Sequence, residues 1–147
     1  MFLFGKRERV IMGTVYRATC PRCGYEEQFC LGSGLGGNNL LLCMRALSEK
    51  EQTDIRKMYE NREIANFLVE NKLTECRHCN TYNKLKDKTI ITITDYNHHS
   101  LVFGGQCCDC GRELRIYDGE IDKDPAKVAC PNCAESFLII YKEGLWG

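Results

Sequence analysis

The stretch "CPRCGY", residues 20–25, is the first of four short cysteine turns on which the architecture of this chain depends. Two residues between Cys20 and Cys23 allow one tight turn to direct both sulfur atoms at a single metal ion. Pro21 suits such a turn, and Gly24 permits the positive φ with which backbone N–H groups can point toward sulfur. The stretch therefore predicts one half of a four-cysteine metal site.

The same spacing occurs three more times. Eight of the eleven cysteines fall into Cys-x-x-Cys pairs, at Cys20/Cys23, Cys76/Cys79, Cys107/Cys110 and Cys130/Cys133. In "CCDCGR", Cys107 rather than Cys108 has the two-residue spacing, and Gly111 then follows the turn as Gly24 does. Four such pairs with flanking Pro, Gly or Asn predict two structural zinc ions per chain, with iron as the alternative metal. Cys30, Cys43 and Cys108 are left without an assigned role.

Distances along the chain suggest how the pairs combine. The 19 residues between Cys110 and Cys130 match the spacing of a two-hairpin zinc ribbon. The 52 residues between Cys23 and Cys76 require an insertion that folds by itself. We therefore predict sequential pairing, in which the first two pairs form one site and the last two form the other. A cross-braced arrangement stays open as the alternative.

Residue patterns around the cysteine pairs predict strands. β-branched, aromatic and alternating residues indicate strands at residues 10–19, 25–31, 84–95, 100–106, 112–118 and 136–142. The insertion looks different, because Ser48 and Glu51 form a capping box that opens a helix. Ile64, Phe67 and Leu68 repeat the helical spacing further along. We expect a helical insertion over about residues 39–72.

The expected fold is therefore a small, metal-bound α+β protein of two zinc ribbons. Its predicted parts are an N-terminal extension at residues 1–11, a first ribbon at 12–96 that contains the helical insertion, and a second ribbon at 97–147. Domains this small bury little apolar surface, so the metal would supply much of their folding free energy.

A glycine pattern, Gly32-x-Gly34-x-x-Gly37, matches the spacing of dinucleotide-binding folds. That fingerprint requires a parallel βαβ unit and an acidic residue about 20 positions further on. Here the preceding strand belongs to an antiparallel hairpin, and Lys57 occupies the later position. We interpret the glycines as a junction between ribbon and insertion, and we expect no nucleotide cofactor.

Composition restricts the cellular setting and the partners. The 147 residues carry 20 basic and 20 acidic side chains, so no net charge attracts nucleic acid or anionic lipid. The chain shows no apolar run of membrane-spanning length and no signal peptide at its start. Cysteines spaced for metal fit a reducing compartment. We expect a cytoplasmic protein without membrane contact.

The order of these features resembles that of a known family. "GTVYRATCPRCGYEEQFCLGSGLG", a helical insertion, "CRHC" and a second ribbon ending in "LW" resemble small bacterial proteins, common in Firmicutes, that carry two zinc ribbons. The resemblance extends over nearly the whole chain from Met12, and its most specific part is Phe29, Leu31, Gly32 and Gly34. It implies the fold and the metal, and it implies no activity.

Other candidate sites are weaker. The segment 77–88 combines basic side chains with an aromatic, as single-stranded nucleic acid requires; its candidate contacts are Arg77, Tyr82, Lys84, Lys86 and Lys88. A solvated strand edge protected by lysines is the competing interpretation, and metal-loaded thiolates would make the chain net negative. Four-cysteine sites leave no open position for catalysis, and no catalytic motif is found. We therefore predict a non-enzymatic adaptor or regulatory protein that binds a protein partner, with nucleic-acid binding and redox chemistry as alternatives.

Overall fold

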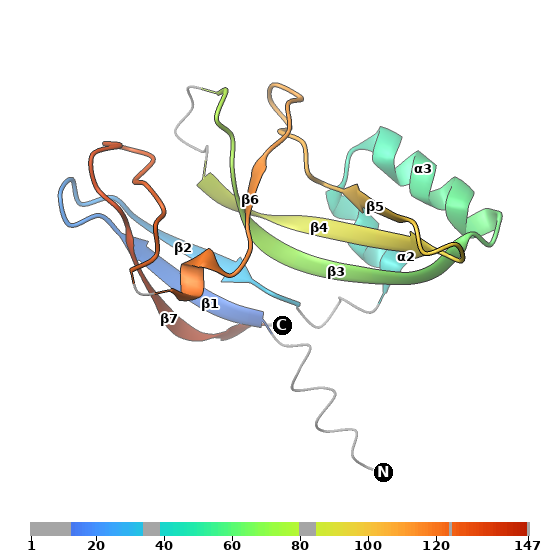
Figure 1. Cartoon of the computed structure of the whole chain (residues 1–147), viewed down its shortest axis with the longest axis horizontal. Helices are drawn as coiled ribbons and strands as arrows, with labels where there is room; N and C mark the ends of the chain where they lie inside the picture. The colour runs from blue at the N-terminus through green and yellow to red at the C-terminus, as the bar shows by residue number, and fades with distance from the viewer. Residues whose placement is uncertain (1–12, 34–38, 80–84, 124, 147) are drawn as a thin grey trace, which may run out of the picture.

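The computed structural model describes residues 13–33, 39–79, 85–123 and 125–146. The chain is a small α+β protein with two antiparallel sheets, ordered β2-β1-β7 and β5-β4-β3-β6 (Figure 1). Along the chain, the elements are β1 (Gly13–Thr19), β2 (Glu26–Leu31), α2 (Leu40–Cys43), η2 (Met44–Ala46), α3 (Glu49–Glu60), β3 (Ile64–Glu75), β4 (Leu85–Asp95), β5 (Ser100–Phe103), β6 (Arg115–Tyr117), η3 (Glu120–Asp122) and β7 (Ile139–Trp146). The predicted extension 1–11, Met12, Gly34, Gly37, Asn80, Tyr82 and Lys84 lie outside the described residues.

The three-stranded sheet brings together the first and the last strand of the described chain. β1 and β2 form the predicted hairpin, and β7 pairs antiparallel with the other edge of β1. The side chains of Tyr16 and Ala18, two positions apart on β1, both face the core. Phe29 from β2 and Leu138, just before β7, belong to the same core. Trp146 connects the end of β7 to the end of β2, because its indole N–H donates to the carbonyl oxygen of Leu31 at 2.8 Å.

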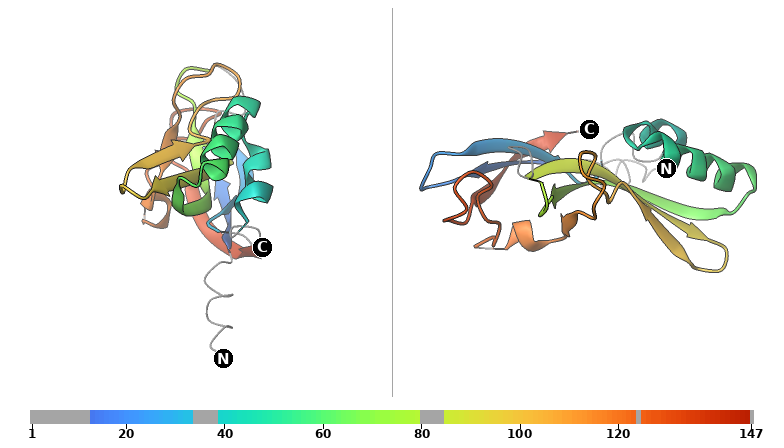
Figure 2. Two further views of the ribbon diagram at one scale, coloured as in Figure 1. Left: turned by 90° about the vertical axis from the view of Figure 1, so that its right-hand side faces the viewer. Right: turned by 90° about the horizontal axis from the view of Figure 1, so that it is seen from above.

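The four-stranded sheet is built on the long β3–β4 hairpin. β5 adds to β4, and the short β6 adds to the far end of β3. The α2, η2 and α3 segments cover one face of this sheet at one end of the molecule (Figure 2). There Ile55 packs with Ile91 and Ile93, and all three side chains are fully buried.

The prediction for the insertion is half right. α2, η2 and α3 are present, and Ser48 and Glu51 form the predicted capping box. Residues 64–72, however, belong to strand β3 and not to a helix. The helical spacing of Ile64 and Phe67 is overruled because β4 supplies a strand partner along the whole length of β3, while Ile, Phe, Val and Asn are weak helix formers.

The two sheets do not follow the predicted division of the chain. The boundary expected between residues 96 and 97 lies in the turn between β4 and β5, which pair within one sheet. The sheets also contact each other, because Gly32 and Asn71 exchange two backbone hydrogen bonds of 2.8 Å. Leu73 and Leu85 from the larger sheet pack into the core of the smaller one. Segments on either side of residue 96 therefore fold together.

Candidate metal centres

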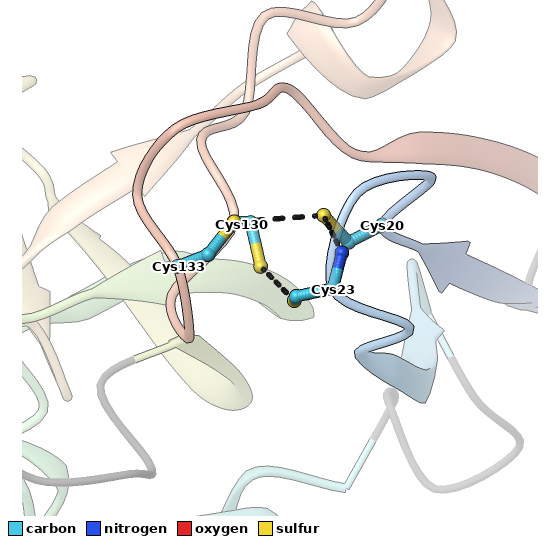
Figure 3. Close-up of side chains that lie close together, drawn as sticks. All are labelled: Cys20, Cys23, Cys130 and Cys133. Atoms are coloured by element: carbon cyan, nitrogen blue, oxygen red, sulfur yellow. Dashed lines mark hydrogen bonds between the residues drawn. The ribbon is translucent and has the colours of Figure 1, made fainter.

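One cluster of four cysteines lies at the end of the β1–β7 pair that is opposite to Gly13 and Trp146. Cys20 and Cys23 come from the turn between β1 and β2, and Cys130 and Cys133 come from the loop that precedes β7 (Figure 3). The Sγ atoms of Cys20 and Cys133 are 3.7 Å apart, and those of Cys23 and Cys130 are 3.6 Å apart. We call this group the outer cluster.

The second cluster lies between the two turns that follow β3 and β5. It consists of Cys76, Cys79, Cys107 and Cys110. The Sγ atoms of Cys76 and Cys110 are 3.6 Å apart, as are those of Cys79 and Cys107. We call this group the inner cluster; it contains Cys107 and not its exposed neighbour Cys108.

The predicted sequential pairing is therefore wrong. The first cysteine pair combines with the fourth, and the second combines with the third, so the inner cluster is nested within the outer one. The cross-braced alternative is not found either. The reason is the strand pairing: β7 returns to β1 and brings the fourth turn to the first, while β4, β5 and β6 hold the third turn beside the end of β3.

The local geometry of the turns agrees with the sequence. Gly24 and Gly111 have φ of 81° and 74°, and each donates its backbone N–H to the carbonyl of the first cysteine of its turn. Ala134 takes the same place in the fourth turn with φ of 58°. The backbone N–H of the second cysteine also donates to the first sulfur, at 3.5 Å from Cys23 to Cys20 and at 3.3 Å from Cys79 to Cys76.

The sulfur positions in both clusters fit a tetrahedral metal ion. With a metal–sulfur bond of about 2.3 Å, the edges of a regular tetrahedron of thiolates measure about 3.8 Å. The sulfur pairs at 3.6–3.7 Å are close to this value. They are also far longer than the roughly 2.05 Å of a disulfide. Each cluster could therefore hold one metal ion with four thiolate ligands.

Hydrogen bonds favour the thiolate form of several of these cysteines. The amide of Asn132 donates to the sulfur of Cys23 at 3.4 Å and, with other donors, lowers the pKa of that thiol to about 6. The backbone N–H of Cys110 is the main cause of a pKa of about 6 at Cys107. In contrast, burial raises the pKa of Cys130 to about 11. A divalent cation would relieve the repulsion that opposes full ionisation of four adjacent thiols.

Asn132 contacts the outer cluster, although the cysteine spacing alone did not point to it. Its position between the cysteines of "CPNC" was the available signal, because side chains inside such a turn lie close to the sulfur atoms. Its amide donates across the cluster to Cys23, which belongs to the opposite turn. Asn132 thus links the two halves of the outer cluster.

The remaining cysteines lie outside both clusters. Cys30 is half-buried on β2, where its backbone N–H donates to a carboxylate oxygen of Asp87 at 2.7 Å. Cys43 is half-buried beside the helical core. Burial raises the pKa of both thiols, so neither is activated as a nucleophile.

Three of the five candidate nucleic-acid residues, Arg77, Lys86 and Lys88, lie in the described part of the chain. Arg77 is exposed and lies 3.9 Å from Glu75. Lys86 and Lys88 are half-buried and line a hollow of about 530 Å³ beside the inner cluster. The ammonium of Lys88 donates to the carbonyl oxygen of Gln106 at 2.8 Å.

Comparison with known proteins adds no assignment. No protein-family model, curated protein or solved structure matches this chain. The helices that the structure describes are all too short or too polar to cross a membrane. The further interpretation therefore rests on the geometry itself.

Proposed function

We propose that both clusters hold zinc and that the chain consists of two nested zinc ribbons. The four-thiolate geometry and the positive φ of the residue after three of the turns support this assignment. Four protein ligands leave no coordination position for a substrate or water, which favours a structural role over a catalytic one. Reduced thiolate sites are consistent with a cytoplasmic setting.

We infer that the protein acts by binding a protein partner, and one observation carries this inference. Phe137, Ile139 and Tyr141 occur at every second position, so they point to one side of the strand. Their exposed fractions are 53, 55 and 48%. Leu138 and Ile140, between them, face the core. A strand that met only water on its outer side would carry polar residues there, so this apolar stripe indicates a covered surface.

The strand that carries most of the stripe also presents a free edge. Within the described residues, β7 pairs only with β1, and its other edge offers backbone N–H and C=O groups. Beside the stripe, Arg17 forms ion pairs with Glu26 and Glu143 and supplies a polar rim. The partner that fits is a protein that adds an extended segment to β7 and covers the stripe with apolar side chains.

The double variant Ile139→Thr with Tyr141→Thr tests this proposal, because threonine keeps strand propensity while removing apolar area. The matched control is Leu101→Thr with Val102→Thr on edge strand β5, where the exposed fractions are 52 and 57%. Partners captured by the metal-loaded protein are compared by quantitative mass spectrometry, and the affinity of each purified candidate is then measured.

We expect a captured protein whose affinity falls at least tenfold with the β7 variant and stays unchanged with the β5 variant. If the β7 variant and the β5 variant bound the captured protein with equal affinity, the proposal would be contradicted. A homodimer in sedimentation equilibrium that depends on Ile139 and Tyr141 would also contradict it, because the stripe would then serve a second copy of this chain.

A further inference from the structure

A second surface feature lies at the opposite end of the molecule from β7, where α3 leads into β3 (Figure 1). It is a hollow of about 860 Å³, within the range of small-molecule sites. Its walls come from the start of α2, the end of α3, the first residues of β3 and the turn after β4. We call it the α3–β3 groove.

The groove is lined by aromatic and aliphatic side chains that contact water. Leu41, Tyr59 and Tyr96 are 44, 55 and 69% exposed, and the partly buried Phe67 on β3 also lines the groove. Exposed tyrosines provide large apolar faces together with hydroxyl groups that can donate hydrogen bonds. Such a lining suits an aromatic or aliphatic ligand body with a polar end.

One charge stands in this apolar setting. Arg62 is the only charged side chain among the described residues that line the groove. No carboxylate of the described chain lies within ion-pair distance of its guanidinium. The planar guanidinium matches a carboxylate with two parallel hydrogen bonds.

We propose that the α3–β3 groove binds a small organic acid, a carboxylate carried on an aromatic or aliphatic body. Arg62 pairs with the carboxylate, while Tyr59, Phe67 and Tyr96 contact the body. This site is separate from the stripe on β7, so it does not depend on the proposed partner.

The test uses the full-length, metal-loaded protein and two probes, 3-phenylpropionate and its neutral amide. Binding is followed by the backbone ¹H–¹⁵N signals of Asn66 and Phe67. We expect saturable shifts with the acid and at least fivefold weaker binding of the amide. Arg62→Asn should weaken binding of the acid at least fivefold. Asparagine tolerates the positive φ of 57° at this position, so the variant keeps the turn.

Arg56→Gln, an exposed charge on α3 outside the groove, is the matched control and should bind the acid like the wild type. The proposal is overturned if the acid gives no saturable shift in the groove, or if the acid and the amide bind equally. It is also overturned if Arg62→Asn binds the acid normally. A peptide with a C-terminal phenylalanine that binds where the free acid does not would assign the groove to a protein terminus and overturn it as well.

Discussion

The sulfur of Cys20 lies 3.7 Å from the sulfur of Cys133, although 113 positions separate the two residues in the chain. One metal ion in the outer cluster would therefore close a loop that contains almost all of the folded protein. The inner cluster closes a much shorter loop within it, since Cys76 and Cys110 are 34 positions apart. The outer cluster thus joins the turn after β1 to the loop before β7, at one end of the smaller sheet.

The nested pairing predicts how cysteine variants lose metal. Replacing all four outer cysteines with serine (Cys20, Cys23, Cys130 and Cys133) should leave the inner cluster complete and one metal ion bound. Replacing the first two pairs instead (Cys20, Cys23, Cys76 and Cys79) should leave two ligands in each cluster and no tightly bound metal. Native mass spectrometry counts the ions directly. The opposite result, no metal in the first variant and one ion in the second, would establish sequential pairing.

Metal removal should affect the smaller sheet first. Cys20 and Cys130 are buried members of its core, whereas the core beneath α3 contains no cysteine of either cluster. A structural zinc site contributes on the order of 10 kcal/mol of folding free energy in small domains. We therefore expect chelation to expose Trp146, the only tryptophan of the chain, and to shift its fluorescence to longer wavelength.

Hydrogen exchange provides the control within the same molecule. After chelation, amide exchange of β1 and β7 should accelerate more than exchange of Ile91 and Ile93 in the core beneath α3. Unchanged circular dichroism and fluorescence after complete metal removal would show that neither cluster supports the fold.

The sequence was informative where structure is set by neighbouring residues. The cysteine turns, with positive φ at Gly24 and Gly111, follow from local geometry, and so does the capping box that begins α3. Most strands were also predictable. Segments such as "TIITITD" in β4 are rich in β-branched residues, and their apolar and polar side chains alternate.

The rest depended on contacts between distant segments. Nothing near Cys133 specifies Cys20 as its neighbour, since that contact results from β7 pairing with β1. Likewise Ile64 and Phe67 fit either a helix or a strand, and only the presence of β4 decides between them. The candidate metal ligands could thus be predicted from residue type and spacing. The way in which these cysteines combine into two clusters could not.

Two buried tyrosines should make stability fall in alkaline solution. The hydroxyl of Tyr16 donates to Asp122 at 2.8 Å, and burial followed by this carboxylate raises the pKa of Tyr16 to about 12. Tyr117 donates to Glu75 at 2.9 Å, and burial with that contact raises its pKa to about 12 as well. The unfolded value is about 10, so their stabilising contribution is complete below pH 10 and is lost as the pH rises toward 12.

Tyrosinate absorbance at 295 nm checks this directly. Wild-type protein should show a late phase of ionisation near pH 12, and Tyr16→Phe should reduce the amplitude of that phase by one phenol. A late phase of the same size in Tyr16→Phe would mean that Tyr16 ionises earlier than the structure implies.

Glu51 should contribute more to stability than its place in an exposed helix turn suggests. One carboxylate oxygen accepts from Ser48 in the capping box, and the other accepts from the buried backbone N–H of Gly104 at 2.8 Å. Glu51→Ala removes the cap contact and leaves that N–H without a partner, which should lower the free energy of unfolding by about 2–3 kcal/mol. Ser48→Ala removes only the cap and should cost about 1 kcal/mol.

Urea denaturation of the metal-loaded protein, followed by helical circular dichroism, measures both losses. Glu49→Ala is the matched control, because Glu49 lies in the same first turn and the structure gives its side chain no tertiary hydrogen bond within the described residues. Its effect should stay within about 0.5 kcal/mol. If Glu51→Ala were no more destabilising than Ser48→Ala, the contact with Gly104 would contribute nothing, and the attachment of α3 to the end of β5 would have to come from apolar packing alone.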